Sequence, residues 1–358
     1  MTGSTGYKKS VRKETGPLSA RLPTSSAITE IRVADEATWN PTAMFSISSG
    51  VFANPALNAQ LDNFLYSLDA EERDFFQQLT GIQDEDALRE HILAVQAKAY
   101  EVYSYPCIRR FSFIRLKIAR LPGYKHALKL LQGHKDPILL DIGCCFGNDA
   151  RKAVIDGWPV HNVVASDLQQ GFWECGHELF KSTPETFPAT FIPGDIFDPA
   201  VFTETPQPSS SPPLVLPPLN TLTSLTPLTH RISAIHASAL FHLFPEARQL
   251  ELARRLAALL RPEKGSIIFG QHASKQEKGV LVVSGQIVNG QPVRVFCHSP
   301  ESWREMWTRE VFGPDSGMGV KVKVEAELVE HNIPDMADGT AALEHDGLWF
   351  MNWAVRVV

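Results

Sequence analysis

Apolar positions between residues 53 and 120 recur at the spacing of helices. In the stretch DEDALREHILAVQAKAYEVY, the apolar residues lie three and four apart, at Leu88, Ile92, Val95 and Ala99. Asp84 or Asp86 is placed to cap this helix, and Pro106 ends it. A shorter run, HALKLLQGHKD, predicts another helix that ends at Gly133.

The rhythm changes at Pro137. Short apolar runs now alternate with helix-like segments, and the runs are ILLDIG, NVVASDL, TFIPGDIFD, RISAIHASALFHLF and GSIIFGQ. Strands that alternate with helices along a chain usually pair in parallel, and helices cover both faces of such a sheet. The pattern therefore predicts an α/β fold with a mostly parallel sheet.

Two segments near the C-terminus alternate apolar and polar residues. They are VKVKVEAELVEH and LWFMNWAVRVV, and their period of two predicts an antiparallel pair at the edge of the parallel sheet. Before them, the segment SGQIVNGQPVRVF contains Asn289 and Gly290, a dipeptide that favours a hairpin turn.

Composition divides the chain into three parts. Residues 1–45 are poor in apolar side chains and basic, which predicts a disordered or extended tail; a transit peptide is the second interpretation. Residues 46–135 form a helical cap, and residues 136–358 form the α/β domain. Within that domain the stretch at about 203–230 is rich in Pro, Ser and Thr, so we expect a surface insertion that does not touch the chemistry.

Charge and hydropathy narrow the class of protein. The 358 residues carry a formal net charge of −6 and contain no apolar run of about 18 residues. An acidic balance disfavours a nucleic-acid partner, and we expect no membrane partner. The five cysteines form no C-x-x-C pair and no metal-ligand spacing. These features predict a cytoplasmic protein that acts on a small molecule without a metal.

The first strand ends in a turn with room for a ligand. The sequence PILLDIGCCFGNDARK places Asp141 in the strand, and Gly143 and Gly147 at its carboxyl end, where open α/β sheets bind ligands. A dinucleotide site needs G-x-G-x-x-G, but the spacing here is G-x-x-x-G, with Cys145 where the middle glycine would stand. Because glycine lets a bulky ligand approach the backbone, the turn favours S-adenosylmethionine over a nicotinamide cofactor.

Carboxylates stand at the ends of the next two strands. Asp167 ends the second strand, where it can accept hydrogen bonds from both ribose hydroxyls. Asp195 ends the third strand, where it can accept one from an adenine amino group. Each acid alone suits a cap or a loop, but acids at three neighbouring strand ends, with a glycine turn at the first, indicate S-adenosylmethionine.

The same motifs carry a resemblance. LLDIGCCFGND, VVASDL and FIPGDIFD resemble the motifs of class I S-adenosylmethionine-dependent methyltransferases, whose Rossmann-like fold is a seven-stranded, mostly parallel sheet. YPCIRRFSF, DIGCCFGNDARK, DGWP, ASALFHLF and HSPESWREMW resemble a fungal natural-product subgroup, in which methyltransferases of meroterpenoid pathways esterify a carboxylic acid. The resemblance spans residues 99–358 without the insertion and implies a homodimer. The insertion and the hairpin depart from the subgroup.

The resemblance also implies which residues hold the cofactor, all of them at four strand ends. In chain order they are Asp141, Gly143, Cys145, Gly147, Asp167, Leu168, Asp195, Ile196, Ala237 and Ser238. The glycine turn would line the methionine part, the second strand end would bind the ribose, and the third would frame the adenine. The fourth would pass beneath the sulfonium.

Histidines near the fourth and fifth strands are candidates for the acceptor side. An acceptor carboxylate is ionised at neutral pH and needs no base, whereas a phenol, with a pKa near 10, benefits from one. His242 is the candidate base or orienter. His236, on the strand itself, suits a satisfied core position. His272 and His298 are candidates for the rim of the acceptor site, and Gln271 is a candidate donor to a substrate oxygen.

Two further segments offer contacts to the acceptor. In YSYPCIRRF, either Arg109 or Arg110 can hold an acceptor carboxylate by a bidentate contact, or lie at a solvated helix end. Tyr103 and Tyr105 can close over the cofactor. SWREMW places two tryptophans on one helical face, where they suit the core, or Trp303 forms one wall of an apolar pocket.

These observations predict an O-methyltransferase of a small, largely apolar metabolite, with a carboxylic acid as acceptor and a methyl ester as product. Methylation of a phenol or enol is the alternative within the enzyme class. Two further hypotheses lie outside the methyltransferase class. One is a nicotinamide-dependent oxidoreductase, which the glycine spacing opposes, and the other is a non-catalytic S-adenosylmethionine-binding partner. The partner reading draws on Cys145 in place of glycine and is opposed by the three acids.

Overall fold

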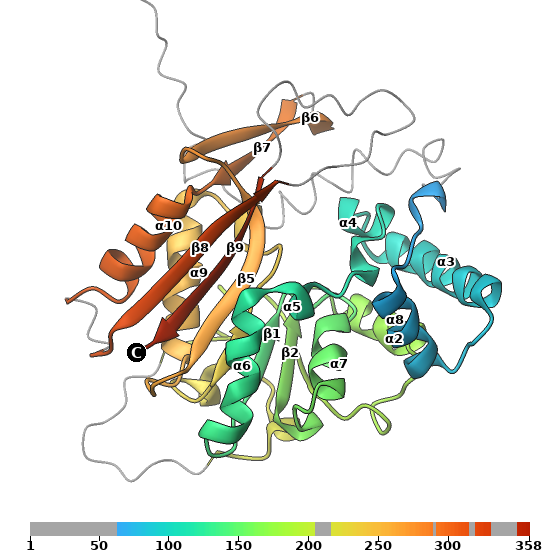
Figure 1. Ribbon diagram of the computed structural model, residues 1–358, viewed down its shortest axis with the longest axis horizontal. Helices are drawn as coiled ribbons and strands as arrows, with labels where there is room; N and C mark the ends of the chain where they lie inside the picture. The colour runs from blue at the N-terminus through green and yellow to red at the C-terminus, as the bar shows by residue number, and fades with distance from the viewer. Residues whose placement is uncertain (1–62, 205–215, 289–290, 315–318, 331–348) are drawn as a thin grey trace, which may run out of the picture.

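A computed structural model of the chain describes residues 63–204, 216–288, 291–314, 319–330 and 349–358. Its centre is a seven-stranded sheet with the order β3-β2-β1-β4-β5-β9-β8 (Figure 1). The strands are β1 (Leu139–Ile142), β2 (Val163–Asp167), β3 (Thr190–Pro193), β4 (Ala234–His236), β5 (Ile267–Ser274), β8 (Val322–Glu330) and β9 (Trp349–Val357). The strands β1 to β5 pair in parallel, and β9 is antiparallel to both of its neighbours. The predicted sheet and its antiparallel edge pair are confirmed.

Helices cover both faces of this sheet (Figure 1). On one face α6 (Pro122–Gly133) and α7 (Asn148–Ile155) share a core with β1, and on the other α9 (Glu246–Leu259) packs through Leu252 and Leu256. The remaining elements of this domain are α5 (Lys117–Arg120), α8 (Gln170–Leu179), α10 (Pro300–Glu305), η4 (Val160–Asn162), η7 (Phe241–Leu243) and η8 (Met306–Val311). In the described part of the chain, no helix combines the length and the apolar character needed to cross a membrane.

The helical cap lies at one end of the sheet, against α8 (Figure 1). Its elements are η2 (Asn63–Leu65), α2 (Ala70–Thr80), α3 (Glu85–Val102), α4 (Pro106–Arg109) and η3 (Ser112–Ile114). Of the two acids proposed to cap α3, Asp84 does so, since its side chain accepts the Ala87 N–H at 2.8 Å. The predicted apolar face of α3 is buried together with Phe146 of the glycine turn and Phe172 of α8. The cap therefore packs directly onto the turn.

The predicted hairpin is present as a separate two-stranded sheet. It consists of β6 (Gly279–Val288) and β7 (Gln291–Cys297), which pair antiparallel. The turn residues Asn289 and Gly290 lie outside the described residues.

The proline-rich stretch departs from its prediction where the structure describes it. Residues 205–215, like the tail at 1–45, lie outside the described residues, but 216–230 is no surface insertion. The segment contains two short 3₁₀ turns, η5 (Leu219–Thr221) and η6 (Thr226–Leu228). The leucines in and beside these turns are buried in the core with α9; they are Leu219, Leu222, Leu225 and Leu228. The density of prolines concealed this burial.

Candidate functional site

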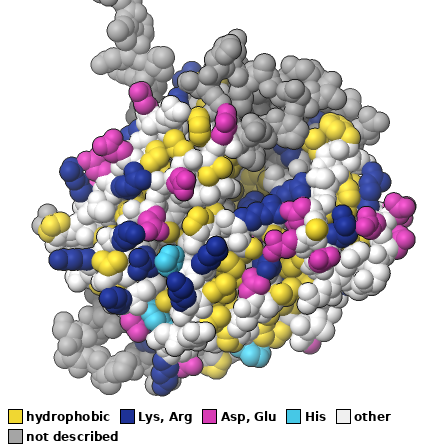
Figure 2. Space-filling view, viewed as in Figure 1, with side chains coloured by type: hydrophobic (Ala, Val, Ile, Leu, Met, Phe, Trp, Pro, Cys, Tyr) yellow, Lys and Arg dark blue, Asp and Glu magenta, His cyan; other side chains and the backbone are white. Residues whose placement is uncertain are grey.

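Four loops meet at the carboxyl edge of the sheet, because parallel strands end on the same side. They follow β1, β2, β3 and β4. Figure 2 shows this face of the molecule hollowed between the sheet and the cap helices, with hydrophobic side chains inside the hollow and Lys or Arg side chains along its edge.

The glycine turn needs left-handed backbone at alternate residues. The φ angles of Gly143, Cys145 and Gly147 are +70°, +52° and +71°. A Cβ on Gly147 would lie 2.5 Å from a ring carbon of Trp173, so only glycine fits there. Cysteine at position 145 accepts a conformation that costs about 1 kcal/mol or more for a side-chain-bearing residue. That conformation turns its N–H toward the second strand.

Asp167 receives this N–H. Its Oδ2 accepts from the Cys145 N–H at 2.8 Å, and its Oδ1 accepts from the Gln169 N–H at 2.9 Å. Burial raises the pKa of Asp167 to about 6, although both N–H groups favour the charged form. Each oxygen keeps capacity for a second hydrogen bond, so the carboxylate can accept two ribose hydroxyls. Tyr105 lies near Asp167. Burial is the main cause that raises the pKa of Tyr105, and Tyr103 and the charge of Asp167 raise it further.

The third strand ends at Pro193, two residues before Asp195. The carboxylate of Asp195 is half-buried, and its Oδ1 accepts the Phe197 N–H at 2.9 Å. Ile196 is buried beside it, whereas Leu168 after β2 exposes 38% of its surface. A polar acceptor between two apolar side chains suits the edge and faces of an adenine ring.

A buried polar chain joins β1 to β4. The ring of His236 hydrogen-bonds through Nδ1 to Asp141 Oδ1 at 2.8 Å and through Nε2 to Ser238 Oγ at 2.7 Å. Burial is the largest influence and opposes the charge of His236, but the hydrogen bond to Asp141 and the negative charges of Asp141 and Asp149 together outweigh it, so the pKa of His236 is raised. His236 is thus satisfied on both nitrogens, which fits the core position expected for it.

Asp141 has one oxygen to spare. Its Oδ2 is buried and has no hydrogen-bond partner among the described residues. A buried carboxylate oxygen without a donor is costly. The α-ammonium group of S-adenosylmethionine would supply that donor beside the glycine turn, so the residues present fit this cofactor.

His242 lies in η7, just after β4, and is half-buried. Its Nδ1 accepts a long hydrogen bond of 3.4 Å from the Ala273 N–H, which leaves the proton of the neutral ring on Nε2. Burial and the positive charge of Lys117 lower the pKa of His242 to about 4. At neutral pH this ring offers a hydrogen-bond donor and is a weak base.

The histidines expected at the rim are not there, and that prediction is wrong. His272 is 1% exposed and His298 is 3% exposed, because both lie inside a block of aromatic rings. The Nδ1 of His272 accepts from the Trp353 indole at 2.9 Å, and the ring centroid of His272 is 4.6 Å from that of Trp303. Trp303 is completely buried, as is Trp307, so the core position proposed for this pair is the one found.

The other acceptor candidates lie on β5, on α4 and in the connection between α3 and α4. Gln271 on β5 donates through Nε2 to Asn352 on β9 at 2.7 Å. The Tyr103 and Tyr105 rings pack together, with centroids 4.2 Å apart, at the end of the cap that faces Asp167. Arg109 is half-buried in α4. The structure thus brings the tyrosines to the cofactor side and turns Gln271 toward β9.

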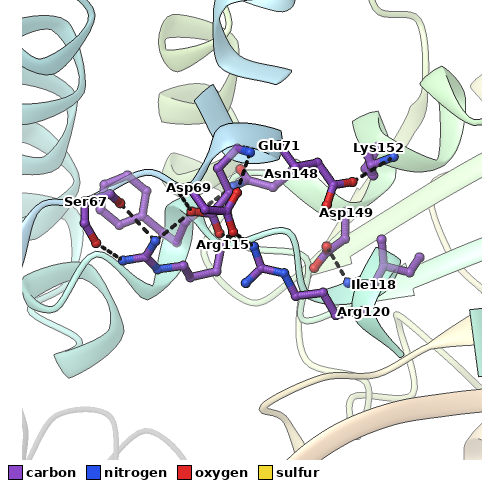
Figure 3. Close-up of polar contacts among 11 residues, drawn as sticks. Ser67, Asp69, Glu71, Arg115, Ile118, Arg120, Asn148, Asp149 and Lys152 are labelled. Carbon is purple, nitrogen blue, oxygen red and sulfur yellow. Dashed lines mark hydrogen bonds and ion pairs between the residues drawn. The ribbon is translucent and has the colours of Figure 1, made fainter. Parts of the chain in front are cut away.

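A buried ion-pair network, which sequence reasoning missed, holds the cap to the turn (Figure 3). Glu72 of α2 is fully buried and accepts from Arg115 at 2.7 Å and Arg120 at 2.8 Å. Between these arginines the Ile118 N–H donates to Asp149 Oδ1 of α7 at 2.9 Å. In the sequence, the sign of this network is the D-x-x-E spacing of Asp69 and Glu72, which is typical of a capping box at the start of a helix.

Three comparisons bear on this site. The family described as meroterpenoid methyltransferase N-terminal domain matches residues 62–114. The chain is 33% identical to the O-methyltransferase phiE of a fungal species over 222 residues, which are 62% of this chain and 65% of phiE. It is 30% identical to the methyltransferase prhM of Penicillium brasilianum over 258 residues, 70% of this chain and 80% of prhM. The chain therefore spans slightly less than two thirds of phiE and a larger share of prhM.

Among solved structures, the chain is similar to a Burkholderia thailandensis 1,6-didemethyltoxoflavin-N1-methyltransferase with bound S-adenosylhomocysteine. The TM-score is 0.39 and the identity 13%, over 74% of this chain and 89% of that one.

Proposed function

Because the chain belongs to the family of fungal S-adenosylmethionine-dependent methyltransferases, we propose that its acceptor is a small, largely apolar carboxylic acid and its product a methyl ester. The cofactor supplies a methyl carbon that its sulfonium has already activated. The chain's own residues then need to hold an acceptor oxygen in line with that carbon at about 3 Å, since positioning alone lowers such barriers by several kcal/mol.

The protonation state of His242 is the observation that supports a carboxylate. A neutral ring with its proton on Nε2 can donate to an acceptor oxygen, but it cannot take a proton on that nitrogen. A carboxylate is already ionised and profits from a donor, whereas a phenol needs a base. In this proposal His242 orients the acceptor carboxylate.

On the cofactor side the proposal gives each strand end one task. Asp167 accepts the ribose hydroxyls, Asp195 and Ile196 hold the adenine, and the glycine turn lines the methionine part. Tyr105 closes over the ribose, and Arg109 adds positive charge for the acceptor. The same proposal includes a cytoplasmic location, which rests on the composition of the chain, and a homodimer, which rests on the family resemblance.

A phenol or enol acceptor is the second candidate. The chain from Asp141 through His236 to Ser238 favours it, because a histidine with a raised pKa can take up a proton that Ser238 relays. The nicotinamide reading has no support from the relatives, which are methyltransferases.

Fractionated acceptors test the proposal. A fungal small-molecule extract is divided by bicarbonate, which takes up carboxylic acids and leaves phenols behind, and each fraction is incubated with the protein and methyl-labelled S-adenosylmethionine. We expect label to enter products of the acid fraction. Transfer confined to the phenol fraction would support the second candidate, and binding of the cofactor without any transfer would support a non-catalytic partner.

A further inference from the structure

Lys117, the first residue of α5, has an ammonium group that makes no close contact with an acid in the described structure, although the charge of Asp149 acts on it at longer range. Its side chain is half-buried. No hydrogen bond or ion pair of its ammonium group is found among the described residues, although the neighbouring Arg115 and Arg120 are both paired. A half-buried lysine can pack its stem against the protein and keep its ammonium group where a partner from outside can reach it. The arrangement suggests that a ligand provides this partner.

The position of the ammonium group follows from the groups that sense its charge. Burial is the largest influence on the pKa of each of these groups, and the charge of Lys117 lowers the pKa of all five: Cys107, Cys145, Asp149, His236 and His242. They belong to α4, the glycine turn, α7, β4 and η7. The geometry agrees: the hydrogen bond from the Ile118 N–H to Asp149 Oδ1, in the first turn of α7, places the adjacent Lys117 beside the glycine turn at the carboxyl edge of the sheet.

The backbone around Lys117 is fixed from both sides (Figure 3). Arg115 and Arg120 bind Glu72 of the cap, and the Ile118 N–H binds Asp149 of α7. The Lys117 N–H bonds to the Arg115 carbonyl oxygen at 3.1 Å. The buried network therefore orients a lysine that takes no part in it.

We propose that Lys117 binds the carboxylate of a ligand at the carboxyl edge of the sheet. Two carboxylates come to this place, the α-carboxylate of the cofactor and the carboxylate of the acceptor. The second source rests on the proposed function, and the first does not. An ammonium group pairs with either by a charge-assisted hydrogen bond.

Two pairs of probes separate these sources by binding alone. S-adenosylhomocysteine carries the α-carboxylate and methylthioadenosine lacks it. Benzoate carries an acceptor-like carboxylate and benzamide does not; these two are titrated with the cofactor site saturated by S-adenosylhomocysteine. Calorimetry compares wild type with Lys117→Met, with Lys117→Arg, and with Lys125→Met, a matched lysine on the exposed side of α6.

We expect wild type to prefer the carboxylate member of at least one pair by about tenfold or more. Lys117→Met should abolish that preference, while Lys117→Arg and Lys125→Met should retain it. If Lys117→Met loses the preference only in the first pair, Lys117 binds the cofactor carboxylate. That assignment would stand even if the protein formed no methyl ester. A loss confined to the second assigns the acceptor.

Lys117→Met that keeps every wild-type preference, or a wild type with no preference in either pair, would overturn the proposal. Thermal unfolding of Lys117→Met and Lys117→Arg checks that each variant is folded. A folded Lys117→Arg protein without the preference would also contradict a role for charge.

Discussion

The polar groups on the two sides of the carboxyl edge, the proposed cofactor side and the proposed acceptor side, differ in their hydrogen bonding. On the proposed cofactor side, Asp167 and Asp195 each accept a hydrogen bond from the backbone N–H two residues later in the chain. Asp167 also accepts one from the N–H of Cys145 in the glycine turn. On the acceptor side the Nε2 atoms of His272 and His298 and the indole N–H of Trp303 are buried without a partner among the described residues. The first side is preorganised for polar contacts with a ligand, and the second is an aromatic block that fixes shape.

This difference predicts where substitutions act. Changes on the cofactor side should weaken binding of the cofactor, because its acids offer free acceptor capacity. Changes in the block and in the cap network should lower stability, because those groups contact only the protein. Changes at His242, which lies between the two, should alter turnover.

The largest effect is expected for Asp167→Ala. It removes a carboxylate that can make two charge-assisted hydrogen bonds, each with a net contribution of about 1.5 to 3 kcal/mol, so affinity for S-adenosylhomocysteine should fall by about a hundredfold or more. Calorimetry measures it. Glu174→Ala, which removes an acid from the exposed face of α8, is the matched control and should bind normally. Equal affinities for the two variants would remove Asp167 from the cofactor site.

Gly147→Ala should lower the free energy of unfolding by about 2 to 3 kcal/mol, since it combines left-handed backbone with a close contact to Trp173. Denaturant unfolding gives the value. Gly133→Ala, at the end of α6, adds a Cβ that meets nothing within 4 Å and should leave stability nearly unchanged. A Gly147→Ala protein as stable as wild type would show that the turn can relax.

Glu72→Gln should destabilise the protein by about 2 kcal/mol. It leaves two arginines without their buried anion, and the cost is below that of a fully buried pair because Arg115 and Arg120 keep side-chain exposures of 29% and 45%. Glu71→Gln, on the same helix as Glu72, alters a contact of 3.5 Å to Lys152 of α7 in which the Glu71 side chain is 54% exposed, and it should change stability little. If both variants unfold alike, the network does not hold the cap.

His242→Ala should reduce turnover by about tenfold, because it removes one modest hydrogen bond to a charged oxygen. Cofactor affinity should stay unchanged. His242→Gln keeps a donor and should lose less. Steady-state kinetics with calorimetry separates the two effects. Because the pKa of His242 is about 4, turnover of an acid acceptor at saturating cofactor should not titrate near neutral pH. A loss of turnover as the pH falls through 7, the behaviour of a general base, would contradict the donor role.

The smallest effect concerns pH. The pKa of free Asp167 is about 6, and the ribose hydroxyls bind its charged form, so affinity falls as pH decreases through 6. The loss should be about twofold at pH 6 and approach tenfold per further unit. In Asp167→Asn this dependence should vanish. A pH dependence that survives in Asp167→Asn would belong to another group.

The residues of the proposed cofactor side are recognisable in the sequence because they lie at or near strand ends. Asp167 is the last residue of β2, Asp195 follows β3 by two residues, and glycine marks the positive φ angles at both ends of the turn. Periodicity likewise predicted the strands and the capped helix α3.

The rest depends on contacts between distant residues. Asp141 and His236 are 95 positions apart, and the burial of His272 and His298 results from β9 and α10 packing against β5. Lys117 lies in the segment SYPCIRRFSFIRLKIARLPGY, where aromatic and basic residues mix and nothing in the pattern distinguishes this lysine. Its orientation follows from Glu72, 45 positions earlier, which no spacing rule connects to it.

The linkage of the transferred methyl group tests the central claim most directly. Product labelled from methyl-labelled S-adenosylmethionine is isolated and treated with mild base. A methyl ester formed on a carboxylate releases its label as methanol, and that is the result we expect. Label that stays with the product would identify an ether, or a methyl on nitrogen or carbon, and would contradict carboxyl methylation at this site.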